Sequence, residues 1–216
     1  SRVFSLLATQ GVRPGNLKVF LAELNAARIW DGKPLPPALK AEIEREWDRL
    51  RLVEEQIRAI TKEQREQLKQ AGSPELEKVK LLTRLRGIGL DSSWILVMEF
   101  FGWREFKNRG EVGGAAGLVG TPYDSGSSER EQGISKAGNP LVRTRMVELA
   151  WLWIRFQPHS ELSQWFQRRF AGGGSRLRRA GIVAVARKLL IALWHLVEHG
   201  VVPQGAVIDL TESSAS

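Results

Sequence analysis

The segment AGIVAVARKLLIALWHLVEH, residues 180–199, is strongly apolar and is followed by Gly200. A helix that is apolar around most of its circumference is normally buried, so we predict that this segment is the core helix of its domain. Two further helices with apolar stripes are predicted at residues 140–156 and 160–170. No segment shows convincing strand alternation, and we therefore expect an all-α fold.

A polar segment rich in Gly and Ser, GLVGTPYDSGSSEREQGISKAGN, occupies residues 117–139, immediately before these helices. A structureless segment of that length within a compact domain is usually either functional or disordered. It holds three clustered serines: Ser125, Ser127 and Ser128. A serine nucleophile needs exposed backbone and nearby cations that stabilise charge on an attacked phosphate. With no histidine nearby, a Ser-His-Asp triad is unsupported, and these residues alone favour a phosphate-binding loop over a nucleophile.

Two short helices joined by a tight turn are predicted after Ser73, which can cap the first of them. The turn contains Gly87 and Gly89 and is flanked by Arg84 and Arg86. This pattern is typical of a helix-hairpin-helix unit, in which the glycines let backbone N–H groups approach a phosphate. An ordinary tight connection between two helices is the alternative interpretation.

A single long helix is predicted at residues 38–70, which contain no Gly or Pro; at 1.5 Å per residue it would be about 50 Å long. Its apolar residues are spaced by three or four positions, close to a coiled-coil seam: Leu39, Ile43, Trp47, Leu50, Val53, Ile57 and Ile60. Such a helix needs a partner, from within the chain or from a second copy. We therefore predict a coiled-coil connector and oligomerisation region at residues 1–72, a helical main domain at 73–205 and a disordered tail at 206–216.

The net charge of +8 is concentrated in one part of the chain. Residues 1–72 contain 13 basic and 10 acidic groups, a difference of +3, whereas residues 136–188 contain 11 basic and 2 acidic groups, a difference of +9. A block of one sign indicates a polyanionic partner. Arginine predominates in the block, and its planar guanidinium suits bidentate contacts with phosphate. Nucleic acid is therefore favoured over a purely solubilising role.

Several classes of protein are disfavoured by composition. The chain has no cysteine, hence no disulfide and no thiolate metal site. His195 and His199 are four residues apart, as zinc ligands can be, but without the usual accompanying motif a solvated helix end is favoured. No run of 18 uncharged apolar residues occurs, so no membrane span or membrane partner is expected. The start lacks both Met and a signal peptide, which suggests a fragment of a longer protein.

The ordered motifs along the chain resemble the C-terminal transposase domain of an insertion-sequence family, the DEDD-type transposases or bridge-RNA-guided recombinases. The resemblance covers most of residues 1–205 and is carried by five motifs: Leu85–Gly89, Gly117–Val119, Thr121–Gly126, Gln132–Asn139 and Met146–Trp151.

This resemblance implies a DNA transposase whose serine attacks a DNA phosphate to form a covalent phosphoserine. In the family pattern the serine precedes a glycine, which here is the step from Ser125 to Gly126; Ser127 and Ser128 are the alternatives. A structured guide RNA would pair with donor and target DNA, so that the protein reads backbone and shape. An N-terminal RuvC-like domain would bind magnesium; that domain is not recognised in this chain, which is itself expected to hold no cofactor and to be inactive alone.

The candidate nucleic-acid-binding residues combine the glycine turn with the cations around the serine segment: Arg84, Arg86, Gly87, Gly89, Lys107, Arg109, Arg130, Lys136, Arg143 and Arg145. No metal-ligating residue is predicted. The implied setting is the bacterial cytoplasm, with the protein associated with the nucleoid as a dimer or higher oligomer. The alternative hypothesis is an α-helical module that binds nucleic acid and dimerises but has no chemistry of its own.

Overall fold

The computed structural model divides the chain into two compact units, Ser1–Glu66 and Gln67–Ser216. For residues 121–133 it describes the backbone only. The described residues of the 216-residue chain are 2–13, 19–70, 72–125 and 128–209.

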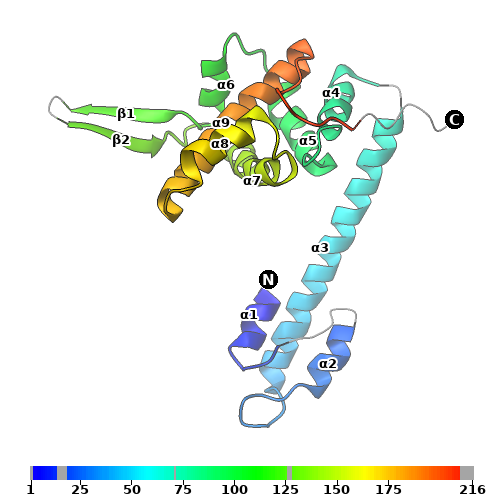
Figure 1. Ribbon diagram of the computed structural model, residues 1–216. Coiled ribbons are helices and arrows are strands. Elements are labelled where there is room, and N and C mark those ends of the chain that lie inside the picture. Colours follow the sequence, from blue (N-terminus) through cyan, green and yellow to red (C-terminus); the bar gives the residue numbers. More distant parts are fainter. Residues whose placement is uncertain (1, 14–18, 71, 126–127, 210–216) are drawn as a thin grey trace. The chain divides into compact units, whose positions relative to one another are not determined.

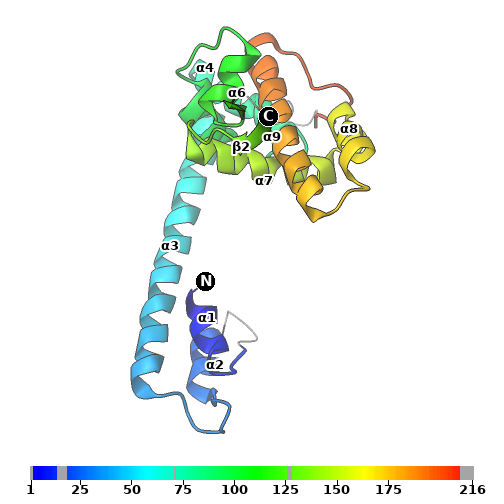
Figure 2. The ribbon, with the colours of Figure 1, turned by 90° about the vertical axis from the view of Figure 1, so that its left-hand side faces the viewer.

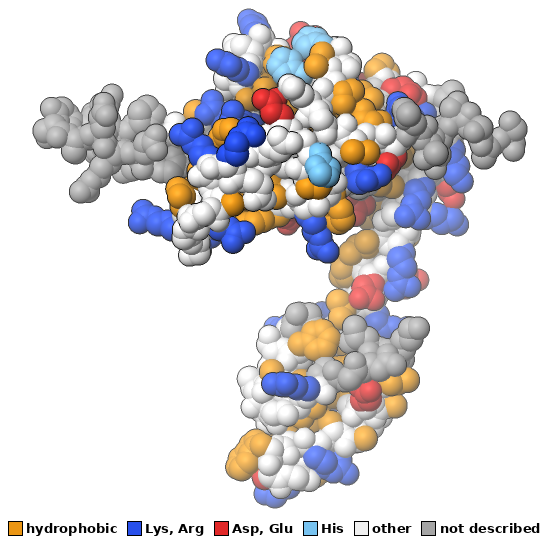
Figure 3. Space-filling view, in the orientation of Figure 1, with side chains coloured by type: hydrophobic (Ala, Val, Ile, Leu, Met, Phe, Trp, Pro, Cys, Tyr) orange, Lys and Arg blue, Asp and Glu red, His pale blue; other side chains and the backbone are white. Residues whose placement is uncertain are grey.

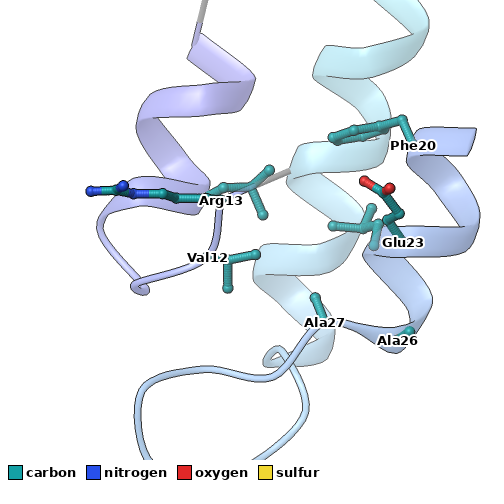
Figure 4. Close-up of a pocket in the computed structure, with 8 residues that line it drawn as sticks. Val12, Arg13, Phe20, Glu23, Ala26 and Ala27 are labelled. Carbon is teal, nitrogen blue, oxygen red and sulfur yellow. The ribbon is translucent and has the colours of Figure 1, made fainter. Parts of the chain in front are cut away.

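The first unit is built from three helices (Figure 1): α1 (Arg2–Ala8), α2 (Phe20–Ala26) and α3 (Pro37–Lys69). The aromatic rings of Phe20 and Trp47 stack with their centroids 4.1 Å apart, which joins α2 to α3. The other buried side chains of this small core are Val3, Leu7, Leu24, Leu35 and Ile43. A cavity of about 330 Å³ lies beside α2, and none of the predicted site residues lines it. Figure 4 shows Phe20 and Glu23 of α2 at this cavity.

The long helix is confirmed, since α3 runs for 33 residues. Its predicted seam divides into two parts. Ile43 and Trp47 are buried in the first unit, whereas Val53, Ile57 and Ile60 are 49%, 54% and 53% exposed. The first part of the stripe therefore has its partners within the chain, and self-association of the second part as a coiled coil stays a prediction.

The second unit contains six α-helices and a π-helical turn among the described residues: α4 (Pro74–Thr83), α5 (Leu90–Leu96), η2 (Val97–Phe101), α6 (Arg109–Ala115), α7 (Pro140–Phe156), α8 (Glu161–Phe170) and α9 (Ser175–His199). Figure 2 shows α9 between α6 and α8. Nine residues of α9 are buried, among them Ile182, Leu189 and Leu193. Its predicted role as the core helix is confirmed.

By length and composition alone, α9 could also cross a membrane. Half of its most apolar window is buried within the domain, however, and it packs against α7, α8 and α6. The same signature is given by the core helix of a globular domain, which is the role α9 has here.

The predominantly helical class is confirmed, with one addition in the serine segment. Residues expected to form a loop instead form an antiparallel hairpin of β1 (Gly120–Ser125) and β2 (Ser128–Ile134). The two strands pair only with each other among the described residues. Pairing across the hairpin satisfies backbone N–H and C=O groups that a long loop would leave to water, and with few apolar residues the segment gives little alternation to detect.

The C-terminal segment corrects a second expectation. Residues 206–209, expected to belong to a disordered tail, run back along the second unit; residues 210–216 lie outside the described part. Ile208 pairs with Leu85 as an isolated β-bridge, and the Asp209 N–H donates to the Arg84 carbonyl (2.9 Å). The buried Gln157 amide donates to the Arg86 and Val207 carbonyls and accepts from the Val207 N–H. Hydrogen bonds between residues this distant in the sequence leave no local sequence pattern from which the packing could be predicted.

Ser73 caps α4 as predicted: its hydroxyl accepts from the Leu76 N–H (3.4 Å), and Pro74 occupies the first turn. A hydrogen bond from the Ser73 side chain, and after it one from the Glu75 backbone N–H, holds the pKa of the Glu75 carboxyl below its usual value. An ionised acidic group at a helix N-terminus interacts favourably with the helix macrodipole and so stabilises the helix.

Candidate nucleic-acid interface

The serine hairpin is attached to the helical body by a short continuation of its pairing. The Ser135 N–H donates to the Val119 carbonyl (2.8 Å), and the Asn139 N–H donates to the Ala115 carbonyl (2.9 Å). The Asn139 side chain then caps α7 by accepting from the N–H groups of Leu141 and Val142. The chain therefore leaves α6 and enters α7 at one place, where residues 115–119 lie against residues 135–139, and we call this place the crossing.

Close packing of backbone at this crossing requires two glycines. Gly117 has a φ of +66°, in the left-handed region that glycine tolerates. A Cβ added to Gly138 would overlap the Ala115 carbonyl oxygen and the Gly117 nitrogen. Lys136, whose N–H donates to the Gly117 carbonyl (3.3 Å), also has a positive φ, +56°, which is uncommon for a residue with a side chain. The crossing is thus defined by steric constraint as well as by hydrogen bonds.

Arg143 has a structural task at the crossing. Its Nη1 donates to the carbonyls of Lys136 (3.1 Å) and Gly138 (3.4 Å), and the side chain is half-buried. The remaining guanidinium donors are open to further hydrogen bonds, because no carboxylate pairs with Arg143 in the described part of the chain. Arg143 therefore positions the hairpin and can still contact a phosphate at its base.

Ser125 lies at the opposite end of the hairpin from this crossing. It is the last residue of β1, and its Cα partner across the strands is Ser128; Ser127 lies outside the described residues. Five residue steps separate it from Gly120, which corresponds to roughly 17 Å along the strand. Figure 1 shows the hairpin projecting away from the helices. The fold therefore does not bring Ser125 beside Arg143 or Arg145, which sequence proximity had suggested.

The other cations predicted around the serine are also separated. The Arg145 guanidinium pairs with Glu148 (2.9 Å), which reduces its availability to a phosphate. Lys136 is exposed at the hairpin base. The backbone of Arg130 pairs with that of Tyr123 on the hairpin, two pairs back from Ser125; its side chain lies outside the described atoms. Of the predicted cations, only Arg130 shares the distal half of the hairpin with the serine.

The predicted glycine turn is tight, with Gly87 half-buried and Gly89 exposed. Gly87 has a φ of +93°, and a Cβ there would press on Phe156 of α7 (3.2 Å). Arg84 and Arg86 are both exposed, and Arg86 pairs with Asp209 at 3.2 Å. Gly89 precedes α5 as its N-cap. The turn can present cations to a phosphate, and its assignment as a helix-hairpin-helix unit stays a prediction.

Lys107 and Arg109 lie at the start of α6. The Glu111 carboxylate accepts from the Lys107 N–H (2.9 Å), and Asn108 caps the helix. Arg109 is exposed and lines a cavity of about 370 Å³ that it shares with α8 and α9. Arg109 therefore faces a surface other than the serine hairpin.

The strongest basic surface among the described residues is one that the predicted site omits. Five exposed arginines surround the turn between α8 and α9, and none pairs with a carboxylate within the described chain: Arg168, Arg169, Arg176, Arg178 and Arg179. We call these five residues the arginine surface. Figure 3 shows Lys and Arg side chains gathered on this side of the unit. The signal was available in the sequence, because residues 162–197 contain no acidic residue.

Comparison with known proteins finds a family that part of the second unit resembles. Residues 79–164 match the family described as Transposase IS116/IS110/IS902 family. The matched segment includes the glycine turn, the hairpin and α7, and it is similar to a transposase domain of that family. The resemblance inferred from the motifs is confirmed at this level.

A relative extends the similarity to nearly the whole chain. The protein named "Putative transposase y4rJ", from Sinorhizobium fredii (strain NBRC 101917 / NGR234), is 43% identical over 221 residues, which cover 96% of this chain and 55% of the relative. The chain thus spans about half the length of that relative. Similarity therefore includes the first unit and α3 as well as the segment that matches the family.

The tight crossing predicts a specific sensitivity to substitution. Gly138→Ala forces the added methyl against the Ala115 carbonyl, and overpacking of this kind costs about 1–3 kcal/mol of unfolding free energy. Gly120→Ala is the matched control, because no atom lies within 4 Å of a Cβ there. Urea unfolding of the two variants should show a clear loss only for Gly138→Ala, and equal midpoints would contradict the crossing.

Proposed function

We propose that this chain is the DNA-handling part of an insertion-sequence transposase in which Ser125 is the nucleophile that attacks DNA. The observation that supports the proposal is the Asp-Ser-Gly step at the outer end of β1, inside the segment that matches the transposase family. A nucleophile on a projecting hairpin can reach a phosphate that the body of the domain does not contact. Ser127 and Ser128 are the neighbouring alternatives.

The proposed chemical step is transesterification. The Ser125 Oγ attacks the phosphorus of a DNA phosphodiester and forms a serine–phosphate ester, while the bond from phosphorus to one sugar oxygen breaks. The serine proton leaves with a general base, and the sugar oxygen gains a proton to become a hydroxyl. One phosphate ester replaces another in this exchange, and no ester is hydrolysed by water. Attack by the freed hydroxyl can therefore reverse the step and rejoin the DNA.

Nucleic acid is the proposed partner, and the arginine surface supports it. Five exposed guanidinium groups without carboxylate partners repel one another, and a phosphate backbone would relieve that repulsion. We propose that donor and target DNA and a structured guide RNA bind the second unit through these arginines together with Arg84, Arg109 and Lys136. Such contacts read the backbone, and pairing with the guide RNA would supply sequence specificity.

We propose that magnesium binds outside this chain. Among the described residues no three His, Cys, Asp or Glu side chains come together as metal ligands, so these residues do not fit the ion. We propose that a RuvC-like domain in the longer protein provides that site in the bacterial cytoplasm. No step of the serine chemistry above is routed through the metal.

Self-association through α3 is proposed from its exposed stripe. Val53, Ile57 and Ile60 lie on one helical face, and each is about half exposed. Pairing with the same face of a second copy would remove this apolar area from water. A non-catalytic binding and dimerisation module would share these surfaces, and the serine experiment below separates it from the enzyme.

Replacing the nucleophile is the direct test of the chemistry. In the product of the complete gene, supplied with its RNA and a DNA substrate, Ser125→Ala should abolish the covalent protein–DNA adduct on a denaturing gel. Ser127→Ala is the matched control, and it should retain the adduct. An adduct that survives Ser125→Ala would overturn the assignment, and its absence in every form of the protein would favour the binding module.

The arginine surface predicts a salt dependence. Each phosphate contact contributes about 0.9 to the slope of log affinity against log salt concentration for duplex DNA. Replacing Arg176, Arg178 and Arg179 by Gln should therefore lower that slope by roughly 2 to 3, as measured by fluorescence anisotropy.

The control for this experiment removes the same charge elsewhere. Arg45, Arg51 and Arg65 are exposed on α3, and the triple Gln variant there has the same net charge as the first. A similar fall in slope for both variants would show that only total charge matters and would contradict a localised arginine surface.

The exposed stripe predicts concentration-dependent association. Sedimentation of the chain should show a dimer or higher oligomer that the double variant Val53→Glu, Ile57→Glu converts to a monomer, because charges would then face each other across the seam. Glu55→Gln, on the opposite face of α3, should leave association unchanged. A monomer at all concentrations for the unmodified chain would refute the proposal.

A further inference from the structure

A cavity of about 370 Å³ lies between α8 and α9, and of the residues that line it only Arg109 has a role in the proposed function. It is formed where α8 and α9 meet the segment that follows α9. The Gln204 carbonyl accepts from the Glu161 N–H (3.0 Å), which brings this segment back to the start of α8. Figure 2 shows the return of the chain toward α8. Small-molecule sites commonly have volumes of about 300–1,000 Å³.

One wall of the cavity is aromatic and apolar. Trp165 of α8 is half-buried, and its ring system meets the Phe170 ring in a T-shaped contact with centroids 5.3 Å apart. Ile191 and Ala192 of α9 and Pro203 continue the apolar lining. A flat indole held by its neighbours is a suitable surface for a planar ring, since an aromatic side chain can stack on the face of any nucleobase.

The charged groups at the cavity are two cations and one carboxylate. Lys188 lies with its Nζ 4.8 Å from the centroid of the Trp165 ring, and Arg109 lines the cavity from the start of α6. Neither pairs with a carboxylate within the described residues. His195 also lines the cavity, and Glu161 is the one acidic residue that does so among the described residues. An aromatic wall with two unpaired cations fits a ligand that is both planar and anionic.

The position of the cavity favours a ligand that is part of a strand. Trp165 lies one helical turn before Arg168 and Arg169, and Lys188 lies on α9, the helix that begins with Arg176, Arg178 and Arg179. A strand whose phosphates contact the arginine surface can therefore extend to the cavity and contact Lys188 there. A paired base is stacked inside its duplex, so only an unpaired base can enter.

We propose that this cavity binds one unpaired nucleotide of the nucleic-acid strand held by the arginine surface. The base lies against Trp165, and Lys188 and Arg109 contact the adjoining phosphate. The inference rests on the proposed nucleic-acid function and adds to it a site for a single extruded nucleotide.

Two single-stranded ligands with equal charge test the proposal by fluorescence anisotropy: the octanucleotide dT8 and an abasic strand with the same number of phosphates. The unmodified chain should bind dT8 about tenfold more tightly, because stacking of one base on an aromatic side chain is sequence-tolerant and of that size. Ala192→Phe fills the cavity without changing charge, and it should reduce the preference to below about threefold. Affinity for the abasic strand should not change.

Trp165→Leu provides a second variant with the same expected loss of preference. Trp151→Leu is its control, because Trp151 is a half-exposed tryptophan of α7 that does not line the cavity. An unchanged preference in both cavity variants would overturn the proposal. Unchanged affinity for the abasic strand also shows that a variant is folded.

Two further outcomes keep the two proposals apart. Failure of the unmodified chain to bind either strand would contradict the nucleic-acid function itself, whereas equal affinity for both would overturn only the nucleotide site. Free dTMP should bind at least a hundredfold more weakly than dT8. Equal affinities would assign the cavity to free nucleotides and overturn its role in strand binding.

Discussion

Burial of α9 is the constraint on which the second unit depends. The helix is apolar on several faces, so it needs neighbours on each, and α4, α6, α7 and α8 provide them. Gly181 lets α8 approach closely, because a Cβ there would overlap the Phe170 ring. With the apolar faces occupied, the arginines at the start of α9 and the end of α8 are left at the surface together. The packing of the core therefore also produces the basic surface.

In the proposed function, binding and chemistry are placed on different parts of the second unit. Cations that are proposed to contact nucleic acid lie on helices and turns of the core, where packing holds them in place. The proposed nucleophile lies at the far end of a hairpin that joins the body at the crossing of Gly117, Gly138 and Arg143. DNA bound by the body can thus be approached by a serine that the body does not itself surround.

The parts of the fold that could be predicted from sequence are those with strong local signals. The apolar run of α9, the long uninterrupted α3 and the Ser73 cap were predicted because periodicity and end residues determine them. The hairpin was missed because its short strands carry few apolar residues, and the packing of residues 206–209 was missed because Gln157 is some fifty residues away. The serine motif located the candidate site, but the distance from Ser125 to Arg143 depends on strand pairing that local spacing does not reveal.

Because the hairpin is built from facing residue pairs, the distance of Ser125 from the helical body can change only by whole pairs. Shortening both strands by one facing pair would draw the serine about 3.3 Å toward the body and reverse the face on which each strand residue lies. Shortening them by two pairs would draw it in by about 7 Å with the same face presented. The length of the hairpin and the face on which Ser125 lies are therefore linked. Evolution can change the length and keep the same face only by adding or removing two residue pairs at a time.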